Sequence, residues 1–159
     1  MKRSHLYHVI IASGFGSGFW PYGPGTAGAL LATLIWLGVS FCVSSVLLIL
    51  LTLLAILIFT FLGVKSADAL EGQWGKDPSR VVIDEMVGVW IALLAANGQN
   101  FMHAFVAFLL FRFFDILKPL GIRKMESIKG GWGVMMDDIL AGIYSFIVLI
   151  FMTKIFHII

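Results

Sequence analysis

Acidic side chains at the ends of apolar segments are the residues of this sequence best suited to chemistry. All nine acidic residues lie between Asp68 and Asp138. Asp84 and Glu85 open one apolar run, and Asp137 and Asp138 open another. Small residues follow each pair by about one helical turn and would let a second helix or a ligand come close. An ionised carboxylate at the centre of a membrane helix costs about 2.5 to 3.5 kcal/mol, so we expect these acids to have partners or a function.

Five of the acids lie at helix ends or inside apolar segments, and these are the candidates for one site: Asp84, Glu85, Asp115, Asp137 and Asp138. A structural alternative is that each pair only complements a helix dipole, which is worth about 0.3 to 1 kcal/mol. Five carboxylates on one face would repel one another, and this repulsion favours a bound cation that offsets it. Because ligands that are all oxygen atoms suit Mg²⁺, we predict a magnesium site.

Basic side chains accompany one of these acids. Arg112, Asp115 and Lys118 are spaced at i, i+3 and i+6, which would place them on nearly the same side of one helix. A guanidinium fork and an ammonium group beside a divalent cation are what a phosphate group needs. We therefore predict that Arg112 and Lys118 bind a substrate phosphate. The alternative is an ion pair in which Arg112 and Asp115 satisfy only each other.

A glycine-rich segment near the start of the chain is a weaker candidate. Residues 14–28 contain six glycines and two prolines and precede an apolar run. Thr26 could cap the helix that follows, and the backbone amides around Gly25 could bind an anion. The segment matches neither the dinucleotide-binding fingerprint nor the P-loop, since no strand precedes it and no Gly-Lys-Ser/Thr follows. A simple turn at the membrane interface is the alternative.

The elements that must position these residues are apolar helices. Hydrophobic residues make up 60% of the 159 residues and charged residues only 13%, about half the share in a soluble domain. Residues 27–64 carry no charge and would span about 57 Å as one helix, whereas the hydrocarbon core of a bilayer is about 30 Å thick. The run is therefore too long to cross the membrane only once. We therefore predict a helical hairpin over about 26–38 and 44–64.

Three further apolar stretches, at 86–96, 101–114 and 139–153, bring the expected number of apolar membrane helices to four or five. The predicted fold is a single all-α domain over residues 1–159, a multi-pass membrane bundle with an acidic site on one side.

The distribution of charge predicts the orientation. The loops at 65–80 and 118–129 hold seven basic residues, whereas the turns near residue 40 and at 97–100 hold none. The positive-inside rule then places both charged loops and the acidic site on the cytoplasmic face. Lys154, beyond the last apolar stretch, fits this pattern less well.

Composition also excludes several functions. A net charge of +2 with dispersed basic residues does not indicate a basic surface that binds nucleic acid. The single cysteine, Cys42, provides neither a disulfide framework nor a Cys-rich zinc site. A small cation transporter that uses intramembrane carboxylates remains the competing class, although transporter sites usually lie near the midplane between repeated halves. A purely structural membrane subunit would leave the convergence of acidic and basic residues unexplained.

Several blocks of the sequence together resemble the bacterial phosphatidylglycerophosphatase A family. They are GSGF at 16–19, PGTAG at 24–28, DPSRVVIDEMVGVWI at 77–91, FRFFDILKP at 111–119 and GGWGVMMDDILAG at 130–142. The resemblance implies a mostly helical enzyme that uses Mg²⁺ to remove the terminal phosphate of phosphatidylglycerophosphate in the bacterial cytoplasmic membrane. The product would be phosphatidylglycerol, and we infer no obligatory protein partner.

On this resemblance we expect four acids to hold the metal or to orient the attacking water: Asp84, Glu85, Asp137 and Asp138. Asp115 is a ligand or a base, and Asp68 and Asp77 are second-rank candidates. The residues expected to contact the substrate phosphate are Arg112, Lys118, Gly25 and Thr26. Direct attack by water is the leading hypothesis, with an aspartyl-phosphate intermediate as the alternative. The acyl chains would stay in the bilayer while the headgroup enters from the cytoplasmic side.

Overall fold

The computed structural model describes residues 3–76, 78–119 and 121–155, and all regular structure in these ranges is helical. The α-helices are α1 (Arg3–Ala12), α2 (Pro24–Ser40), α3 (Ser45–Trp74), α4 (Ile83–Leu93), α5 (Phe101–Leu117) and α6 (Gly131–Ile150). Two short 3₁₀ helices, η1 (Ser17–Phe19) and η2 (Ile122–Ser127), lie in the connections, and a π-helical turn, η3 (Phe151–Ile155), continues α6. The predicted all-α class is confirmed.

Two helices of the described part are long and apolar enough to cross a membrane: α3, and α6 with its extension as far as Lys154. Of the four or five membrane helices that the sequence predicts, these two are candidates by length and composition. The apolar run at 86–96 belongs to α4, whose 11 residues extend only about 16 Å. Most of its side chains are buried among the other helices, so its apolar character reflects a protein core rather than contact with lipid.

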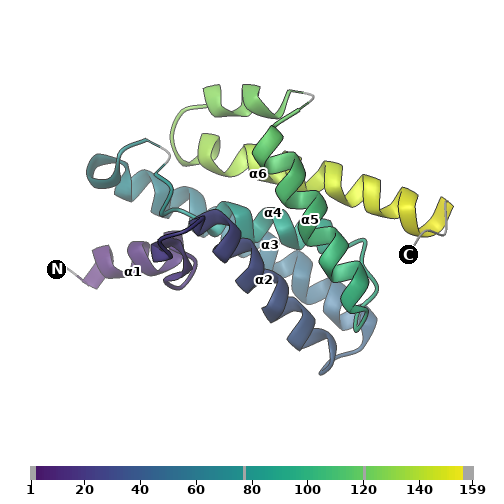
Figure 1. Ribbon diagram of the computed structural model, residues 1–159. Helices are drawn as coiled ribbons and strands as arrows, with labels where there is room; N and C mark the ends of the chain where they lie inside the picture. The colour runs from purple at the N-terminus through teal and green to yellow at the C-terminus, as the bar shows by residue number, and fades with distance from the viewer. Residues whose placement is uncertain (1–2, 77, 120, 156–159) are drawn as a thin grey trace.

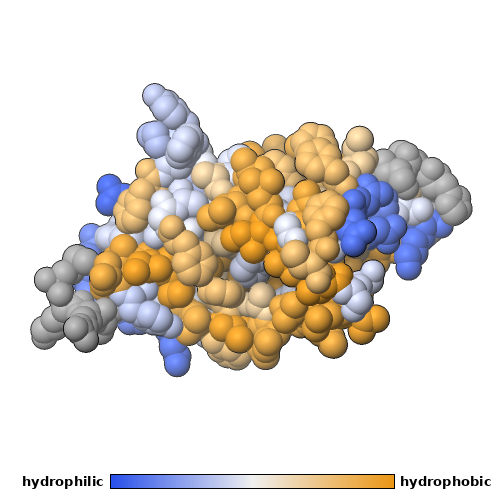
Figure 2. All heavy atoms as spheres, turned by 90° about the horizontal axis from the view of Figure 1, so that it is seen from below, coloured by the Kyte–Doolittle hydropathy of each residue, from blue (hydrophilic) through white to orange (hydrophobic). Residues whose placement is uncertain are grey.

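The outer surface of α3 is strongly apolar. Val46, Leu50, Leu54 and Leu57 are each more than half exposed. Figure 2 shows a broad hydrophobic area over the middle of the molecule, with hydrophilic residues toward both ends. This pattern suits a molecule whose middle lies in hydrocarbon and whose ends meet water.

The predicted hairpin is present with shifted boundaries. Its turn lies between Ser40 and Ser45, and the side chain of Ser44 accepts a hydrogen bond from the backbone N–H of Leu47 at 3.4 Å. The second helix continues about ten residues beyond the predicted end, because residues 65–74 are mostly good helix formers, and it ends at Gly75, whose φ of +86° favours glycine.

Helix α4 lies at the centre of the bundle and packs against α2, α3, α5 and α6 (Figure 1). Its closest approach is to α6 at Gly88 and Gly142. A Cβ added at Gly142 would collide with the carbonyl oxygen of Gly88, and one added at Gly88 would lie 2.7 Å from the carbonyl oxygen of Asp138. The small residues after each acidic pair therefore let the two helices meet, as the sequence predicted.

The position of the second acidic pair differs from the prediction. Asp137 and Asp138 do not open their helix, since α6 begins six residues earlier at Gly131. The backbone N–H of Gly131 donates to Oδ1 of Asp68 at 2.5 Å, which satisfies one free amide of the helix start. The glycines at 131 and 133 leave no room for a side chain, because an added Cβ would collide with the backbone carbonyl of Val64 at Gly131 and with that of Ile128 at Gly133.

Candidate active site

Three carboxylates from two helices form the centre of the candidate site. Asp84 and Glu85 lie in the first turn of α4, and Asp138 lies in α6 about two turns from its start. Each offers one oxygen, and these three oxygens lie within 4.8 Å of one another. Asp84 is only 6% exposed and Asp138 only 3%. The close contact of α4 with α6 at Gly88 explains why acids more than 50 residues apart in the sequence meet here.

Helix α5 brings Arg112 and Asp115 to the edge of this cluster. Nη1 of Arg112 donates to Oδ2 of Asp115 at 2.5 Å. Asp115 is buried, and its carboxyl group is also within hydrogen-bonding reach of that of Asp138. The structure therefore contains the Arg112–Asp115 ion pair that the sequence offered as the alternative to phosphate binding, and through Asp115 this pair contacts the cluster.

Lys118 and Asp137 form a second ion pair beside the cluster. Nζ of Lys118 lies 2.6 Å from Oδ2 of Asp137. Lys118 does not share the helical face of Arg112, because α5 ends at Leu117 and Lys118 has a left-handed backbone with φ of +46°. The signal for this ending is Pro119, since a proline disfavours helical geometry at the residue before it. Asp137, predicted as a metal ligand, thus lies outside the group of three oxygens.

The glycine-rich segment contributes backbone to the site. A Cβ added at Gly25 would collide with Oε1 of Glu85 and would lie 3.3 Å from Nη1 of Arg112. Gly25 is in the first turn of α2, so the positive end of that helix dipole lies against the carboxylates. The predicted capping role of Thr26 is wrong: the helix begins at Pro24 after Gly23, and Thr26 lies within the first turn and is exposed.

Burial dominates the electrostatics of the cluster. Burial and the neighbouring acids raise the pKa of Asp84 well above its ordinary value, and burial raises the pKa of Glu85 to about 7. Both residues lie in α4, outside the two candidate membrane-spanning helices. Buried carboxylates this close together need either shared protons or a cation.

Two buried polar atoms of the site have no hydrogen-bond partner among the described residues. They are Oε2 of Glu85 and Nε of Arg112. A buried polar atom without a partner costs about 1 to 3 kcal/mol. The carboxylate oxygen can accept a hydrogen bond or bind a cation, and the guanidinium N–H can donate to an anion.

Of the two second-rank acids, Asp68 does not join the group of three oxygens. Asp68 binds the first turn of α6 through Gly131 and so positions the helix that carries Asp138. Asp77 lies outside the described residues.

Comparisons with known proteins cover nearly the whole chain. Residues 10–153 match the family model described as Phosphatidylglycerophosphatase A. Proteins named phosphatidylglycerophosphatase A are 42% identical in Haemophilus influenzae, with 93% of this chain and 91% of the relative covered, and 36% identical in Escherichia coli, with 91% and 82% covered. A Bacteroides thetaiotaomicron protein that carries the provisional name phosphatidylinositol-3-phosphatase is 56% identical, with 94% and 95% covered. No solved structure matches the chain.

Proposed function

The chain belongs to the phosphatidylglycerophosphatase A family, and from this premise we propose that it hydrolyses phosphatidylglycerophosphate to phosphatidylglycerol and inorganic phosphate. Membership makes it an enzyme, a phosphoric monoester hydrolase. The observation that best supports hydrolysis of a phosphate ester is the cluster of Asp84, Glu85 and Asp138 beside the guanidinium group of Arg112. A cation transporter would explain the acids but not the family.

We propose Mg²⁺ as the cofactor, held by Asp84, Glu85 and Asp138. The donors are all carboxylate oxygens, and Oε2 of Glu85 is buried without a hydrogen-bond partner among the described residues. When bound, Mg²⁺ would neutralise charge on the phosphate group and make its phosphorus more electrophilic. Asp137 would support the site by holding Lys118 close to it.

The chain's own residues provide the remaining functions. Arg112 has five N–H donors, so it can keep its bond to Asp115 and still bind a phosphate oxygen through Nε. The backbone amides of the first turn of α2, around Gly25 and Thr26, lie where they can bind another oxygen of the same group. Asp115, which contacts Asp138, would accept a proton from the attacking water and return it to the glycerol oxygen as the bond from phosphorus to that oxygen breaks.

Replacing Arg112 tests whether it binds phosphate. Arg112→Lys keeps a positive charge near Asp115 but loses the planar guanidinium group with its paired N–H donors, and Arg112→Gln loses both the charge and the guanidinium group. We expect kcat/KM for phosphatidylglycerophosphate to fall about 10- to 100-fold in the glutamine variant, from a lost charge-assisted bond of about 1.5 to 3 kcal/mol. The kcat/KM of the lysine variant should lie between that of the glutamine variant and that of the unmodified enzyme. If the glutamine variant instead yields less folded protein with unchanged specific activity, Arg112 serves only the ion pair with Asp115.

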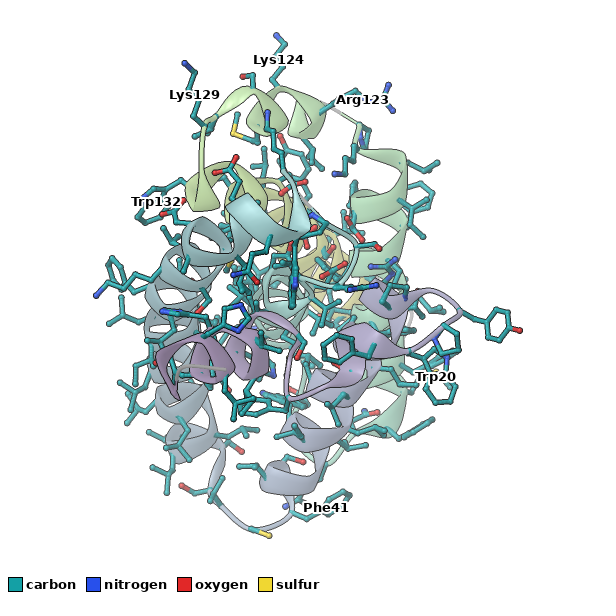
Figure 3. The ribbon with its side chains drawn as sticks, turned by 90° about the vertical axis from the view of Figure 1, so that its left-hand side faces the viewer. Trp20, Phe41, Arg123, Lys124, Lys129 and Trp132 are labelled. Atoms are coloured by element: carbon teal, nitrogen blue, oxygen red, sulfur yellow. The ribbon has the colours of Figure 1, made fainter. Side chains whose placement is uncertain are left out.

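We also propose that the enzyme is a multi-pass protein of the bacterial inner membrane with its active site on the cytoplasmic face. Arg123, Lys124 and Lys129 project from one end of the molecule, and Phe41 lies at the other end (Figure 3). The positive-inside rule favours the cytoplasm for the basic end. The acyl chains of the substrate could then remain in the adjacent leaflet while the headgroup reaches the carboxylates.

Labelling of single cysteines tests this orientation. Cys42, the one cysteine of the sequence, is exposed in the turn between α2 and α3 and reports on the end that holds Phe41. Ser79→Cys or Ser127→Cys in a Cys42→Ser background reports on the basic end, where both serines are exposed. In intact spheroplasts a membrane-impermeant thiol reagent should label Cys42 and neither introduced cysteine, and inside-out vesicles should give the reverse. Labelling at residue 79 in spheroplasts would overturn the cytoplasmic site.

A comparison of two lipid substrates tests the substrate assignment. The purified full-length enzyme should release phosphate from phosphatidylglycerophosphate with a higher kcat/KM than from phosphatidylinositol 3-phosphate, the lipid suggested by the name of the Bacteroides relative. A preference for the inositol lipid would keep the phosphatase chemistry and overturn the proposed substrate.

A further inference from the structure

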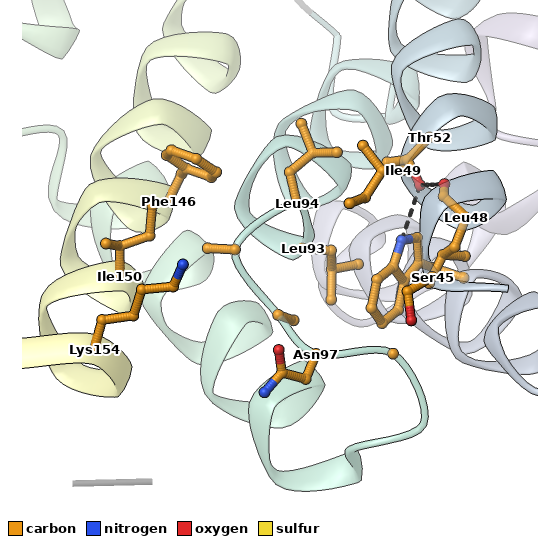
Figure 4. Close-up of a pocket in the computed structure, with 14 residues that line it drawn as sticks. Ser45, Leu48, Ile49, Thr52, Leu93, Leu94, Asn97, Phe146, Ile150 and Lys154 are labelled. Atoms are coloured by element: carbon orange, nitrogen blue, oxygen red, sulfur yellow. Dashed lines mark hydrogen bonds between the residues drawn. The ribbon is translucent and has the colours of Figure 1, made fainter. Parts of the chain in front are cut away.

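A cavity of about 450 Å³ lies at the end of the bundle away from the carboxylate cluster. It opens where α4 ends, between the N-terminal part of α3 and the C-terminal part of α6 (Figure 4). Leu48, Ile49, Phe146 and Ile150 contribute apolar walls. The indole N–H of Trp36 donates to Oγ1 of Thr52 at 3.0 Å, which fixes another part of the wall. The cavity therefore lies between the two helices that are candidates to cross the membrane.

The polar groups of this cavity can bind an anion. Lys154 of η3 extends its ammonium group into the cavity, and Asn97 lies across from it (Figure 4). Ser45 adds a hydroxyl group at the first turn of α3. No carboxylate lines the cavity in the described part of the chain, and no described carboxylate forms an ion pair with Lys154. Lys154 is thus the one charged residue in the described lining of the cavity.

The position of Lys154 in the sequence strengthens this reading. It lies 16 residues beyond Asp138 along α6 and its extension, or about 24 Å of helix. The two turns at this end, 41–44 and 94–100, carry no charged residue. Lys154 is exposed at the edge of this cavity, so its ammonium group can meet a charged headgroup while its aliphatic stem lies along the apolar walls.

We propose that this cavity binds the headgroup of an anionic phospholipid from the leaflet opposite the active site. The ammonium of Lys154 pairs with the lipid phosphate, Asn97 and Ser45 donate hydrogen bonds to its oxygens, and an acyl chain packs along Phe146 and Ile150. A lipid suits the site better than free phosphate because apolar side chains make up much of the lining and the neighbouring surface, where Val46 is 70% exposed. The proposal depends on the membrane location proposed above but not on the catalytic assignment.

Lipid-dependent thermal stability of the purified full-length enzyme in detergent tests this site. The probes are phosphatidylserine as the anionic lipid, phosphatidylcholine as the zwitterionic lipid and inorganic phosphate without a lipid. We expect phosphatidylserine to raise the Tm of the unmodified enzyme in a saturable manner, with smaller effects of the other two probes. In Lys154→Gln the apparent Kd for phosphatidylserine should rise at least about tenfold, and in Lys154→Arg it should change little.

Two further variants locate the effect. Asn97→Asp keeps the lysine but places a negative charge opposite it, so it should also raise the apparent Kd for phosphatidylserine. Lys124→Gln removes an exposed lysine at the other end of the molecule, and Arg112→Gln alters the active site; both should respond like the unmodified enzyme. Phosphate release by Lys154→Gln should stay normal, which separates this site from the catalytic one. An unchanged Kd in both Lys154→Gln and Asn97→Asp would overturn the proposal, as would equal stabilisation by phosphatidylcholine or by inorganic phosphate.

Discussion

Replacing Asp84, Glu85 or Asp138 by its neutral amide isostere is expected to lower phosphate release about 10³-fold, since a cation at a phosphoryl group contributes several kcal/mol and about 1.4 kcal/mol corresponds to tenfold in rate. Each substitution preserves the shape of the side chain but removes a charge from the group of three oxygens. The measurement is the initial rate of phosphate release from phosphatidylglycerophosphate by equal amounts of purified protein.

Two other acids provide controls for this series. Glu71→Gln neutralises an exposed carboxylate of α3 and should leave the rate unchanged. Asp137→Asn removes the partner of Lys118 rather than a member of the cluster, so we expect a smaller loss than in the three cluster variants. Rates near normal in any two of the cluster variants would rule out the carboxylate site.

Replacing Gly25 by alanine should inactivate the enzyme without removing any functional group. The added methyl group would collide with Oε1 of Glu85, so either the carboxylate or the start of α2 must move. A displacement of about 1 Å at a catalytic site can cost about 100-fold in rate, and we expect a loss of at least this size in kcat/KM. Phosphate release and the Tm of the variant should be measured together.

The matched control lies in the same helix. A Cβ added at Gly38 meets nothing within 4 Å, so Gly38→Ala should keep full activity and leave stability equal or slightly higher. If Gly25→Ala loses no more activity than Gly38→Ala, the start of α2 does not shape the site.

The meeting of the acidic residues was largely predictable from the sequence. Acids beside apolar runs are costly unless they gather, and the glycines at 88 and 142 indicated where two helices could approach closely enough to bring them together. The spacing of Arg112 and Asp115 allowed two roles for Arg112, phosphate binding and an ion pair with Asp115. The structure shows the ion pair.

Other features depend on tertiary contacts that no local pattern records. The beginning of α6 at Gly131 depends on its N–H bond to Asp68, 63 residues earlier, and on close packing against the carbonyl of Val64. The apolar run of α4 has the composition of a membrane helix, and its short length alone does not distinguish a buried helix from a partial span. Only the surrounding helices show that it forms the core. The partner of Lys118 was missed because the left-handed turn before Pro119 redirects that side chain toward α6.

The most direct test of the account is the rate of phosphate release from phosphatidylglycerophosphate by the purified full-length enzyme as a function of free Mg²⁺. Removal of divalent cations with EDTA should abolish the reaction, and added Mg²⁺ should restore it along a saturable curve. A rate that is the same with EDTA as with saturating Mg²⁺ would contradict the proposal that Asp84, Glu85 and Asp138 act by holding a metal ion.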